Sequence, residues 1–304
     1  MRFDGLDLNL LVALDILLTE KNITRAGEKL FLSQPATSAA LARLRDYFED
    51  DLLVQVGRSM VLTPMGENLA KPVSDLLIQM RTVLNNKNKF DPLKAKRKFT
   101  VMASDYTGNV LLPRLNQLLY SLSPQCSIEQ LMPSSEAEKQ IERGKVDILF
   151  LPSLSILDEH PSLDVFEDEF VCVMWNQNPL KEKPLTLEDY TQAEHVVVRL
   201  GAINKTPMID DWLIRNLDIK RNVAYVATNF NSVPRFVVGT PYIAIMHKKL
   251  AVQCAEYLPI HLCPLPWEVP KIKICMQWNK FQENDAGLLW FRQLIMQVTK
   301  ELDV

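Results

Sequence analysis

The segment that most restricts how this chain folds is ITRAGEKLFLSQPATSAALARL, residues 23–44. Apolar residues recur in it at helical spacing: Leu30, Leu32, Leu41 and Leu44. Ser33 is a good helix N-cap, and Pro35 falls in the first turn, where a missing N–H costs nothing. Gly27 has no side chain, so two helices can cross closely there. We therefore predict a short helix, a tight turn and a second helix.

Small polar and basic side chains remain on the outer face of the second helix: Gln34, Thr37, Ser38 and Arg43. Such side chains hydrogen-bond base edges or phosphates, and a recognition helix enters the major groove by its N-terminal end. The segment thus has the layout of a DNA-binding helix-turn-helix. An ordinary surface helical hairpin is the alternative, because short motifs of this kind give false positives.

The flanking residues extend this unit. An apolar helix precedes the motif, with a stripe formed by Leu8, Leu11, Leu14 and Leu18. Residues 52–63 follow it as two short strands around a Gly57–Arg58 turn, which predicts a wing. Arg58 at the tip is placed to reach a phosphate or the minor groove. An exposed turn arginine without a DNA contact is the alternative.

A long helix is predicted from Pro64 to about residue 86. Its apolar residues alternate steps of four and three: Leu69, Val73, Leu76, Met80 and Val83. This 3.5-residue period is that of a two-stranded coiled coil, so we expect these residues to form a dimer seam. A dimer would place two recognition helices on a two-fold axis that matches a palindromic DNA site. The alternative is a helix that packs on its own domain.

Charge and composition restrict the partners only modestly. The net charge is −3, yet five Lys or Arg face a single acid within residues 21–45, a local basic face suited to phosphates. No run of about 18 uncharged apolar residues indicates a membrane span. Acids near the N-terminus argue against a signal peptide, and five scattered cysteines without a CxxC pair fit a reduced, cytoplasmic protein.

The remainder of the 304 residues is predicted to be an α/β domain behind an exposed basic hinge at residues 86–98. Strands are expected at 99–104, 127–132, 146–151, 170–175, 195–199, 222–227, 242–246 and 271–278, with helices at 107–122, 135–144, 207–217, 231–239 and 284–302. Alternation of this kind indicates parallel sheets covered by helices. Two sheets joined by crossover strands near 170–175 and 271–278 would leave a cleft for a small ligand.

Several motifs together resemble the LysR-type transcriptional regulators. DLNLL (7–11), ITRAGEKL (23–30), LSQPATSAALARLR (32–45) and LTPMGE (62–67) are similar to that family's DNA-binding domain. NPL (178–180) and LTLEDY (185–190) are similar to its effector-binding domain. The segments MRFDGLDLNLLVALD, DDLLVQVGR and FDPL are most similar to the branch of the nodulation and naphthalene–salicylate regulators.

The resemblance implies an activator, usually tetrameric, whose two-lobed, periplasmic-binding-protein-like α/β domain binds a small inducer. The implied domains are a winged helix-turn-helix (1–63), a dimerising linker helix (64–86), a hinge (87–97) and an effector-binding domain (98–304), with lobe I at about 98–170 and 276–304 and lobe II at about 171–275. Expected partners are double-stranded DNA, a small-molecule effector and further copies of the chain, as a dimer of dimers, with RNA polymerase as a candidate and no membrane.

The residues expected at DNA are Thr24, Arg25, Ser33, Gln34, Pro35, Thr37, Ser38, Arg43 and Arg58. By resemblance, the helix start (Thr24, Arg25) faces phosphates, the recognition segment contains Gln34, Pro35 and Ser38, and Arg58 is the wing arginine. Two positions depart from the family, because Ala39 and Gln55 stand where a basic residue is common. We therefore expect a weak salt-dependent component of DNA binding.

The effector is expected at loops that follow strand ends, where helix N-termini present free N–H groups. The candidate residues are Ser104, Asp105, Tyr106, Asn204, Lys205, Phe230, Asn231 and Ser232. Tyr106 and Phe230 suit an aromatic ring, so the hypothesis is a small aromatic or carboxylated inducer. The alternatives are N-capping by Asp105 and Ser232, a solvated Lys205, and aromatic rings that belong to the core.

No catalytic motif is present: the sequence lacks G-x-S-x-G, Walker A, G-x-G-x-x-G and H-E-x-x-H patterns. Its four histidines are isolated, and we predict no enzyme activity, metal or cofactor. Cys172 and Cys275 fall in the expected crossover strands and are predicted to be buried and inert, with redox sensing as the alternative. A solute-binding protein with a helical extension, and a DNA binder without an inducer, remain as competing functions.

Overall fold

The computed structural model describes residues 2–3, 6–85, 90–200, 208–217 and 219–302. The chain forms two compact units, the first built on residues 1–89 and the second on most of the remainder. The division falls within the basic segment that was expected to be a hinge.

The first unit is a winged helix-turn-helix followed by a long helix. Its elements are β1 (Arg2–Phe3), β2 (Leu6–Asp7), α1 (Asn9–Glu20), α2 (Ile23–Leu30), α3 (Gln34–Phe48), β3 (Leu53–Val56), β4 (Ser59–Leu62) and α4 (Pro64–Asn85). β3 and β4 pair antiparallel around Gly57, whose φ of 62° is one that glycine adopts without strain. The predicted helix-turn-helix, wing and long helix are confirmed.

Leucine side chains hold this unit together. The fully buried ones include Leu14, Leu17, Leu41, Leu44, Leu52 and Leu53. Burying a leucine stabilises a fold by about 1.5–3 kcal/mol relative to leaving it exposed. A β-carbon at Gly27 would lie 2.9 Å from Thr37 Oγ1 and 3.0 Å from the carbonyl oxygen of Leu32. The close approach predicted at Gly27 is therefore confirmed.

The apolar residues expected to line a seam on α4 lie in different environments. Val73 is only 6% exposed and belongs to the leucine core, with Leu69 packed against that core. Met80 is partly buried, whereas Leu76 and Val83 are 44% and 70% exposed. The expectation that Val73 faces a second chain is wrong, because that side of α4 packs on α1 of the same chain.

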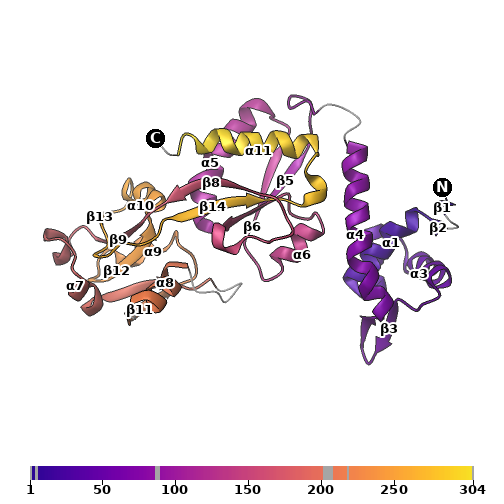
Figure 1. Cartoon of the computed structure of the whole chain (residues 1–304), viewed down its shortest axis with the longest axis horizontal. Helices are drawn as coiled ribbons and strands as arrows, with labels where there is room; N and C mark the ends of the chain where they lie inside the picture. The colour runs from indigo at the N-terminus through magenta and orange to yellow at the C-terminus, as the bar shows by residue number, and fades with distance from the viewer. Residues whose placement is uncertain (1, 4–5, 86–89, 201–207, 218, 303–304) are drawn as a thin grey trace. The chain divides into compact units, whose positions relative to one another are not determined.

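The described residues of the second unit contain two five-stranded sheets (Figure 1). The lobe I sheet has the order β6-β5-β7-β14-β8, formed by β5 (Lys98–Met102), β6 (Ser127–Leu131), β7 (Ile148–Pro152), β8 (Ser162–Asp168) and β14 (Ile272–Gln277). Its helices are α5 (Asp105–Leu122), α6 (Ala137–Glu142) and α11 (Ala286–Thr299), with 3₁₀ turns at Ser153–Ser155 and Lys280–Gln282.

The lobe II sheet has the order β11-β10-β12-β9-β13. Its strands are β9 (Phe170–Trp175), β10 (Glu194–Val198), β11 (Asn222–Ala227), β12 (Ile243–His247) and β13 (Ile260–Cys263). Its helices are α7 (Leu187–Gln192), α8 (Met208–Leu217), α9 (Val233–Val237) and α10 (Lys248–Ala255), with a 3₁₀ turn at Pro179–Glu182. The predicted two-lobed α/β architecture is confirmed.

Two chain crossings join the lobes, from β8 to β9 through Glu169 and from β13 back to β14. β9 runs antiparallel to β12 and β13, and β14 runs antiparallel to β7 and β8. The expected parallel sheets are therefore mixed. The physical reason is that these strands enter from the other lobe rather than through a helical crossover within their own sheet. Residues 272–275 consequently belong to the lobe I sheet, not to lobe II as expected.

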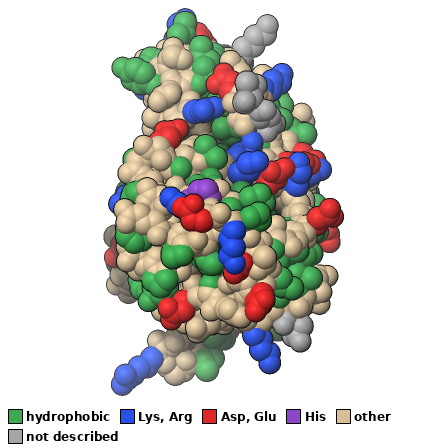
Figure 2. Space-filling model, turned by 90° about the vertical axis from the view of Figure 1, so that its left-hand side faces the viewer, with side chains coloured by type: hydrophobic (Ala, Val, Ile, Leu, Met, Phe, Trp, Pro, Cys, Tyr) green, Lys and Arg blue, Asp and Glu red, His purple; other side chains and the backbone are tan. Residues whose placement is uncertain are grey.

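The helices that the structure describes include none that is both long and apolar enough to cross a membrane. The side of lobe II that faces the viewer in Figure 2 carries acidic and basic side chains interspersed with hydrophobic ones. A phosphate backbone is bound by clustered basic side chains, so this face does not have the charge distribution of a DNA-binding surface.

Candidate DNA interface and effector cleft

The N-terminal end of α3 is a capped and solvent-exposed helix start. The Ser33 side chain accepts a hydrogen bond from the backbone N–H of Ala36 at 3.4 Å, as its predicted capping role requires. Gln34, Pro35 and Ser38 are all exposed. The amide and hydroxyl groups of this helix end are therefore free to meet base edges.

Thr37 does not belong to this exposed face, and the prediction that it reads bases is wrong. Its side chain is fully buried, and its hydroxyl donates a hydrogen bond to the carbonyl oxygen of Ser33 at 3.0 Å. The hydroxyl oxygen of Thr37 also faces Gly27, where α2 and α3 approach each other closely. Thr37 is thus a packing residue of the helix-turn-helix.

The basic side chains of this unit, and Thr24, differ in whether they already bind a partner within the protein. Arg58 is exposed at the wing tip, and Thr24 is exposed at the start of α2. Arg25 donates to the carbonyl oxygen of Glu20 at 3.0 Å, and Arg43 pairs with Asp7 at 3.3 Å, with both side chains largely accessible. Arg45 donates to backbone carbonyls at 2.8 and 2.6 Å and so stabilises the approach to the wing.

In the second unit, Asp105 connects the two lobes. It begins α5 of lobe I, and its Oδ2 accepts a hydrogen bond from the backbone N–H of Asn231 in lobe II at 2.8 Å. Burial raises the pKa of Asp105, against the opposing effect of the backbone hydrogen bonds. Its other oxygen, Oδ1, is buried without a hydrogen-bond partner among the described residues. The structure therefore brings residue 105 and the 230–232 loop into contact, while their role in effector binding stays a prediction.

The remaining candidate effector residues differ in whether their side chains cap a helix. The Ser104 hydroxyl caps α5 by accepting from the N–H of Thr107 at 3.3 Å. Ser232 precedes α9 but makes no capping bond, and its hydroxyl donates to the carbonyl oxygen of Asn229 at 3.2 Å. Asn204 and Lys205 lie outside the described residues.

Tyr106 and Phe230 are buried, which favours the alternative that their rings belong to the core, and their contact with a ligand stays a prediction. Tyr106 is 2% exposed, and its hydroxyl donates to Asp168 Oδ2 at 2.7 Å. Its ring stacks on His247 with a centroid distance of 3.7 Å, and Phe230 packs edge-on against the same histidine at 4.7 Å. The rings meet because α5, β12 and the 230–232 loop all bury side chains where the two lobes adjoin.

Asp168 and His247 are central to this contact, and the sequence patterns did not identify either. Asp168 accepts hydrogen bonds from the backbone N–H groups of Glu169 and Lys249, at 2.8 and 3.1 Å, besides that of Tyr106. Burial lowers the pKa of His247 to about 3. The feature that could have identified them is their position in the chain, since Asp168 ends the last strand before the crossing and His247 ends β12.

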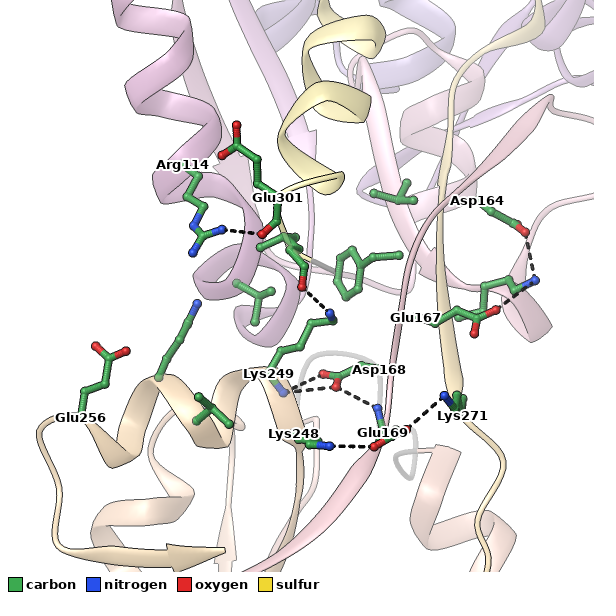
Figure 3. A pocket seen from close by; sticks show the side chains of 17 residues that line it. Arg114, Asp164, Glu167, Asp168, Glu169, Lys248, Lys249, Glu256, Lys271 and Glu301 are labelled. Carbon is green, nitrogen blue, oxygen red and sulfur yellow. Dashed lines mark hydrogen bonds and ion pairs between the residues drawn. The ribbon is translucent and has the colours of Figure 1, made fainter. Parts of the chain in front are cut away.

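A pocket of about 800 Å³ lies beside the crossings, between α5, α10 and β14 (Figure 3). Charged pairs line it: Lys248 and Lys271 both reach Glu169, at 2.9 and 3.0 Å, and Lys273 reaches Asp164 at 3.0 Å. Arg114 donates to the carbonyl oxygen of Glu301 at 3.1 Å. Since these cations already have partners, the pocket is not a ready anion site.

Two cysteines, Cys172 and Cys275, and the buried His195 have surroundings that indicate structural roles. Cys275 donates to Asp164 at 3.2 Å, and burial raises its pKa to about 11, which disfavours the reactive thiolate. Cys172 is fully buried. The Nε2 of His195 lies 2.8 Å from the carbonyl oxygen of Tyr190, and burial lowers its pKa to about 4. Among the described residues, no group of three or more His, Cys, Asp or Glu is arranged to hold a metal ion.

Comparison with known proteins identifies both units. The bacterial regulatory helix-turn-helix model of the lysR family matches residues 8–67, and the LysR substrate binding domain model matches residues 94–300. Nodulation protein D of Bradyrhizobium sp. (strain ANU 289) is 36% identical over 98% of this chain and 88% of its own length. Nodulation protein D 2 of Rhizobium tropici is 37% identical over 98% and 94%.

Solved structures agree with this assignment. A probable transcriptional regulator from Pseudomonas aeruginosa is 26% identical with a TM-score of 0.66, over 96% of this chain and 97% of that one. Full-length OxyR from the same organism has the same fold, with a TM-score of 0.74 at 16% identity over 98% and 96%. The chain therefore belongs to the LysR family of transcriptional regulators: it is a DNA-binding regulator with an effector-binding domain, not an enzyme.

Proposed function

We propose that this regulator reads a dyad DNA site through the exposed N-terminal end of α3, with Gln34 and Ser38 as base readers. Pro35 and the capping Ser33 lie in the same helix start, and Thr24, Arg25, Arg43 and Arg58 supply phosphate contacts around it. The observation that carries this proposal is that Gln34, Pro35 and Ser38 are all exposed on one capped helix end. A recognition helix contacts base edges with such N-terminal residues.

The assembly proposed is a dimer through α4, and a dimer of dimers on the operator. Leu76 and Val83 support the dimer, because both are apolar and largely exposed on one helix. Residue Met80 lies between them at coiled-coil spacing. The cytoplasm as the site of action and RNA polymerase as a further partner belong to the same proposal, as those of a regulator that acts at promoters.

The inducer is proposed to bind in the interlobe cleft at Asp105 and Asn231, beside Ser104 and Ser232. The aromatic character expected from Tyr106 and Phe230 loses that support, because both rings are buried in the core. A carboxylated inducer is disfavoured as well, because the carboxylate of Asp105 already accepts the N–H of Asn231. The buried Oδ1 of Asp105 favours a neutral ligand that donates a hydrogen bond, such as one carrying a hydroxyl.

Two binding experiments test these assignments on the full-length chain. A duplex selected by the wild-type protein from a random-sequence pool should bind Gln34→Ala and Ser38→Ala roughly 5- to 150-fold more weakly, since a good base contact discriminates by about 1–3 kcal/mol. The exposed Ala42→Ser variant, further along α3, is the matched control. Unchanged affinity of both variants would exclude α3 as the reader.

Calorimetry with phenols and with aromatic carboxylates tests the cleft. We expect heat from a hydroxylated compound in the wild type and its loss in Asp105→Ala, because the buried acceptor is removed. Binding of carboxylates alone, or equal binding by wild type and Asp105→Ala, would show that the ligand does not use Asp105.

A further inference from the structure

Phe31 is the most exposed large hydrophobic side chain among the described residues. It lies in the turn between α2 and α3 and is 95% exposed, while the adjacent Leu32 is 44% exposed. Single apolar residues on a surface are ordinary and need no explanation by themselves. The backbone of Phe31 is what distinguishes it.

Phe31 has a φ of 56°, in the left-handed region that asparagine and glycine adopt most readily. This conformation closes α2, because the Phe31 N–H reaches the carbonyl oxygen of Glu28 at 3.3 Å. An aromatic residue is a poor choice there on conformational grounds. In the free protein the phenyl ring packs on almost nothing that could offset the strain.

The other non-glycine residues with positive φ do not share this combination. Leu52 is fully buried, so its side chain contributes to the leucine core. Lys21 and Glu49 are polar residues that close α1 and α3 and can be solvated. Among the described residues, Phe31 alone is apolar, exposed and left-handed.

The place of Phe31 indicates what its ring contacts. Gln34 is three positions further along the chain, so the Cα atoms of the two residues lie no more than about 11 Å apart, less than the roughly 12 Å width of the major groove. The exposed side chains at the start of α3 include Pro35, Ala36 and Ala39. This surface has apolar groups but no cation, and the apolar group that the major groove presents is the 5-methyl group of thymine.

We propose that Phe31 is a DNA-contacting residue that packs on a thymine methyl group in the major groove beside the start of α3. The proposal rests on the role of α3 as recognition helix. The contact explains why a phenylalanine occupies a backbone position suited to asparagine, since its apolar surface is buried only in the complex with DNA.

The test uses the full-length chain, the duplex selected by the wild type from a random-sequence pool, and the variant Phe31→Asn. Because asparagine tolerates the left-handed backbone, the variant should unfold at the same temperature as the wild type or higher. Its affinity for the duplex should fall about tenfold, as for other buried aromatic contacts. Phe31→Gly provides a second variant with the same expectation, and Glu49→Asn, at the far end of α3, should retain wild-type affinity.

Duplexes in which deoxyuridine replaces single thymines identify the contact. One replacement should weaken the wild type but leave Phe31→Asn unaffected. Wild-type affinity of Phe31→Asn would overturn the proposal, and so would equal sensitivity of both proteins to every replacement. The variant Gln34→Ala distinguishes a failure of this proposal from a failure of the proposed recognition helix. If Gln34→Ala also binds the duplex normally, α3 itself is not the reader. A loss of affinity in Gln34→Ala alone rejects only the Phe31 contact.

Discussion

The cations of α3, the helix proposed to read DNA, already have partners within the protein and would have to exchange them for phosphates. Arg43 is paired with Asp7 at 3.3 Å, and Arg45 is held by backbone carbonyls. Ala39 is exposed where a basic residue is common in the family, and Gln55 in the wing donates to the carbonyl oxygen of Gly57 at 3.2 Å. The weak salt dependence expected from the sequence therefore stays a prediction with a structural basis.

Ala39→Arg should add one phosphate contact per subunit. Each contact steepens the plot of log affinity against log salt concentration by about 0.9, so the slope should increase by about one unit per subunit engaged. Anisotropy titrations between low and moderate salt measure it, with Ala39→Gln as the uncharged control. A slope that does not change would place residue 39 away from the DNA.

His247 should make the effector-binding domain sensitive to acid. Its folded pKa is lowered to about 3 by burial, whereas an unfolded histidine titrates near 6.5. The unfolded chain thus binds the extra proton first, so this contribution is intact above about pH 6.5 and is lost as the pH falls toward 3. Burial of His195 acts in the same direction. The raised pKa values of Asp105, Asp168 and Asp210 act in the opposite one.

His247→Phe isolates this effect, because it keeps an aromatic ring against Tyr106 and removes only the titration. Nδ1 of His247 has no hydrogen-bond partner among the described residues, so the substitution sacrifices no bond from that atom. As the pH falls from 7 to 5, the free energy of unfolding of the variant should increase by about 2 kcal/mol relative to that of the wild type. All five tryptophans lie at or beyond residue 175, so fluorescence during urea unfolding reports this domain. His261→Gln is the control, and parallel pH profiles for the two variants would contradict the prediction.

At the scale of elements, α4 carries apolar residues in two different environments along its length. Val73 contributes to the leucine core of the first unit, while Leu76 and Val83 remain exposed. A single heptad pattern therefore covers both residues of the core and residues that are proposed to form a dimer seam. The 3.5-residue period was sound evidence for a long helix, but it did not indicate which turns are covered by the same chain.

Val73→Ala and Leu76→Glu/Val83→Glu should separate these purposes. Val73→Ala creates a cavity and should lower the stability of the first unit by about 2 kcal/mol without dissociating the dimer. Leu76→Glu/Val83→Glu should leave the thermal unfolding of this unit nearly unchanged but raise the dimer dissociation constant. Circular dichroism and sedimentation velocity measure the two effects. A reversed outcome would assign the seam to the other face of α4.

Elements with a clear hydrophobic period could be predicted from the sequence. Elements that are held in place mainly by their tertiary surroundings could not. β9 and β11 are continuous or near-continuous apolar runs and were placed at their observed bounds. β8 was missed because SLDVFED carries three acids, although it is held by pairing with β14. Similarly, the polarity of Thr37 suggested an outward side chain, but its orientation depends on the approach of α2 at Gly27. The loops proposed to bind the effector could be predicted because they follow the ends of strands. The roles of Asp168 and His247 could not, because they depend on how the two lobes pack.

At the scale of the effector-binding domain as a whole, two groups of contacts determine how the lobes are held together. Near the chain crossings, Asp168 binds Tyr106 of lobe I and the backbone of Lys249 of lobe II. At the cleft, the Asp105–Asn231 hydrogen bond provides a second connection. A ligand that binds at Asp105 would compete with or strengthen the second connection and leave the first intact. The Asp105–Asn231 contact is therefore the connection that we propose an inducer alters.

Asp105→Ala should loosen that side selectively. Removing the acceptor leaves the Asn231 amide without its hydrogen bond, so it should exchange with deuterated solvent roughly tenfold faster, as loss of a bond worth about 1.4 kcal/mol implies. The Lys249 amide, bound by Asp168, should keep its wild-type rate, and Asp105→Asn should show a smaller change because its carbonyl oxygen still accepts. Hydrogen exchange read by mass spectrometry on peptides covering both amides measures this. Equal acceleration at both sites would mean that the lobes separate as one unit, and that Asp105 does not govern the cleft independently of the crossings.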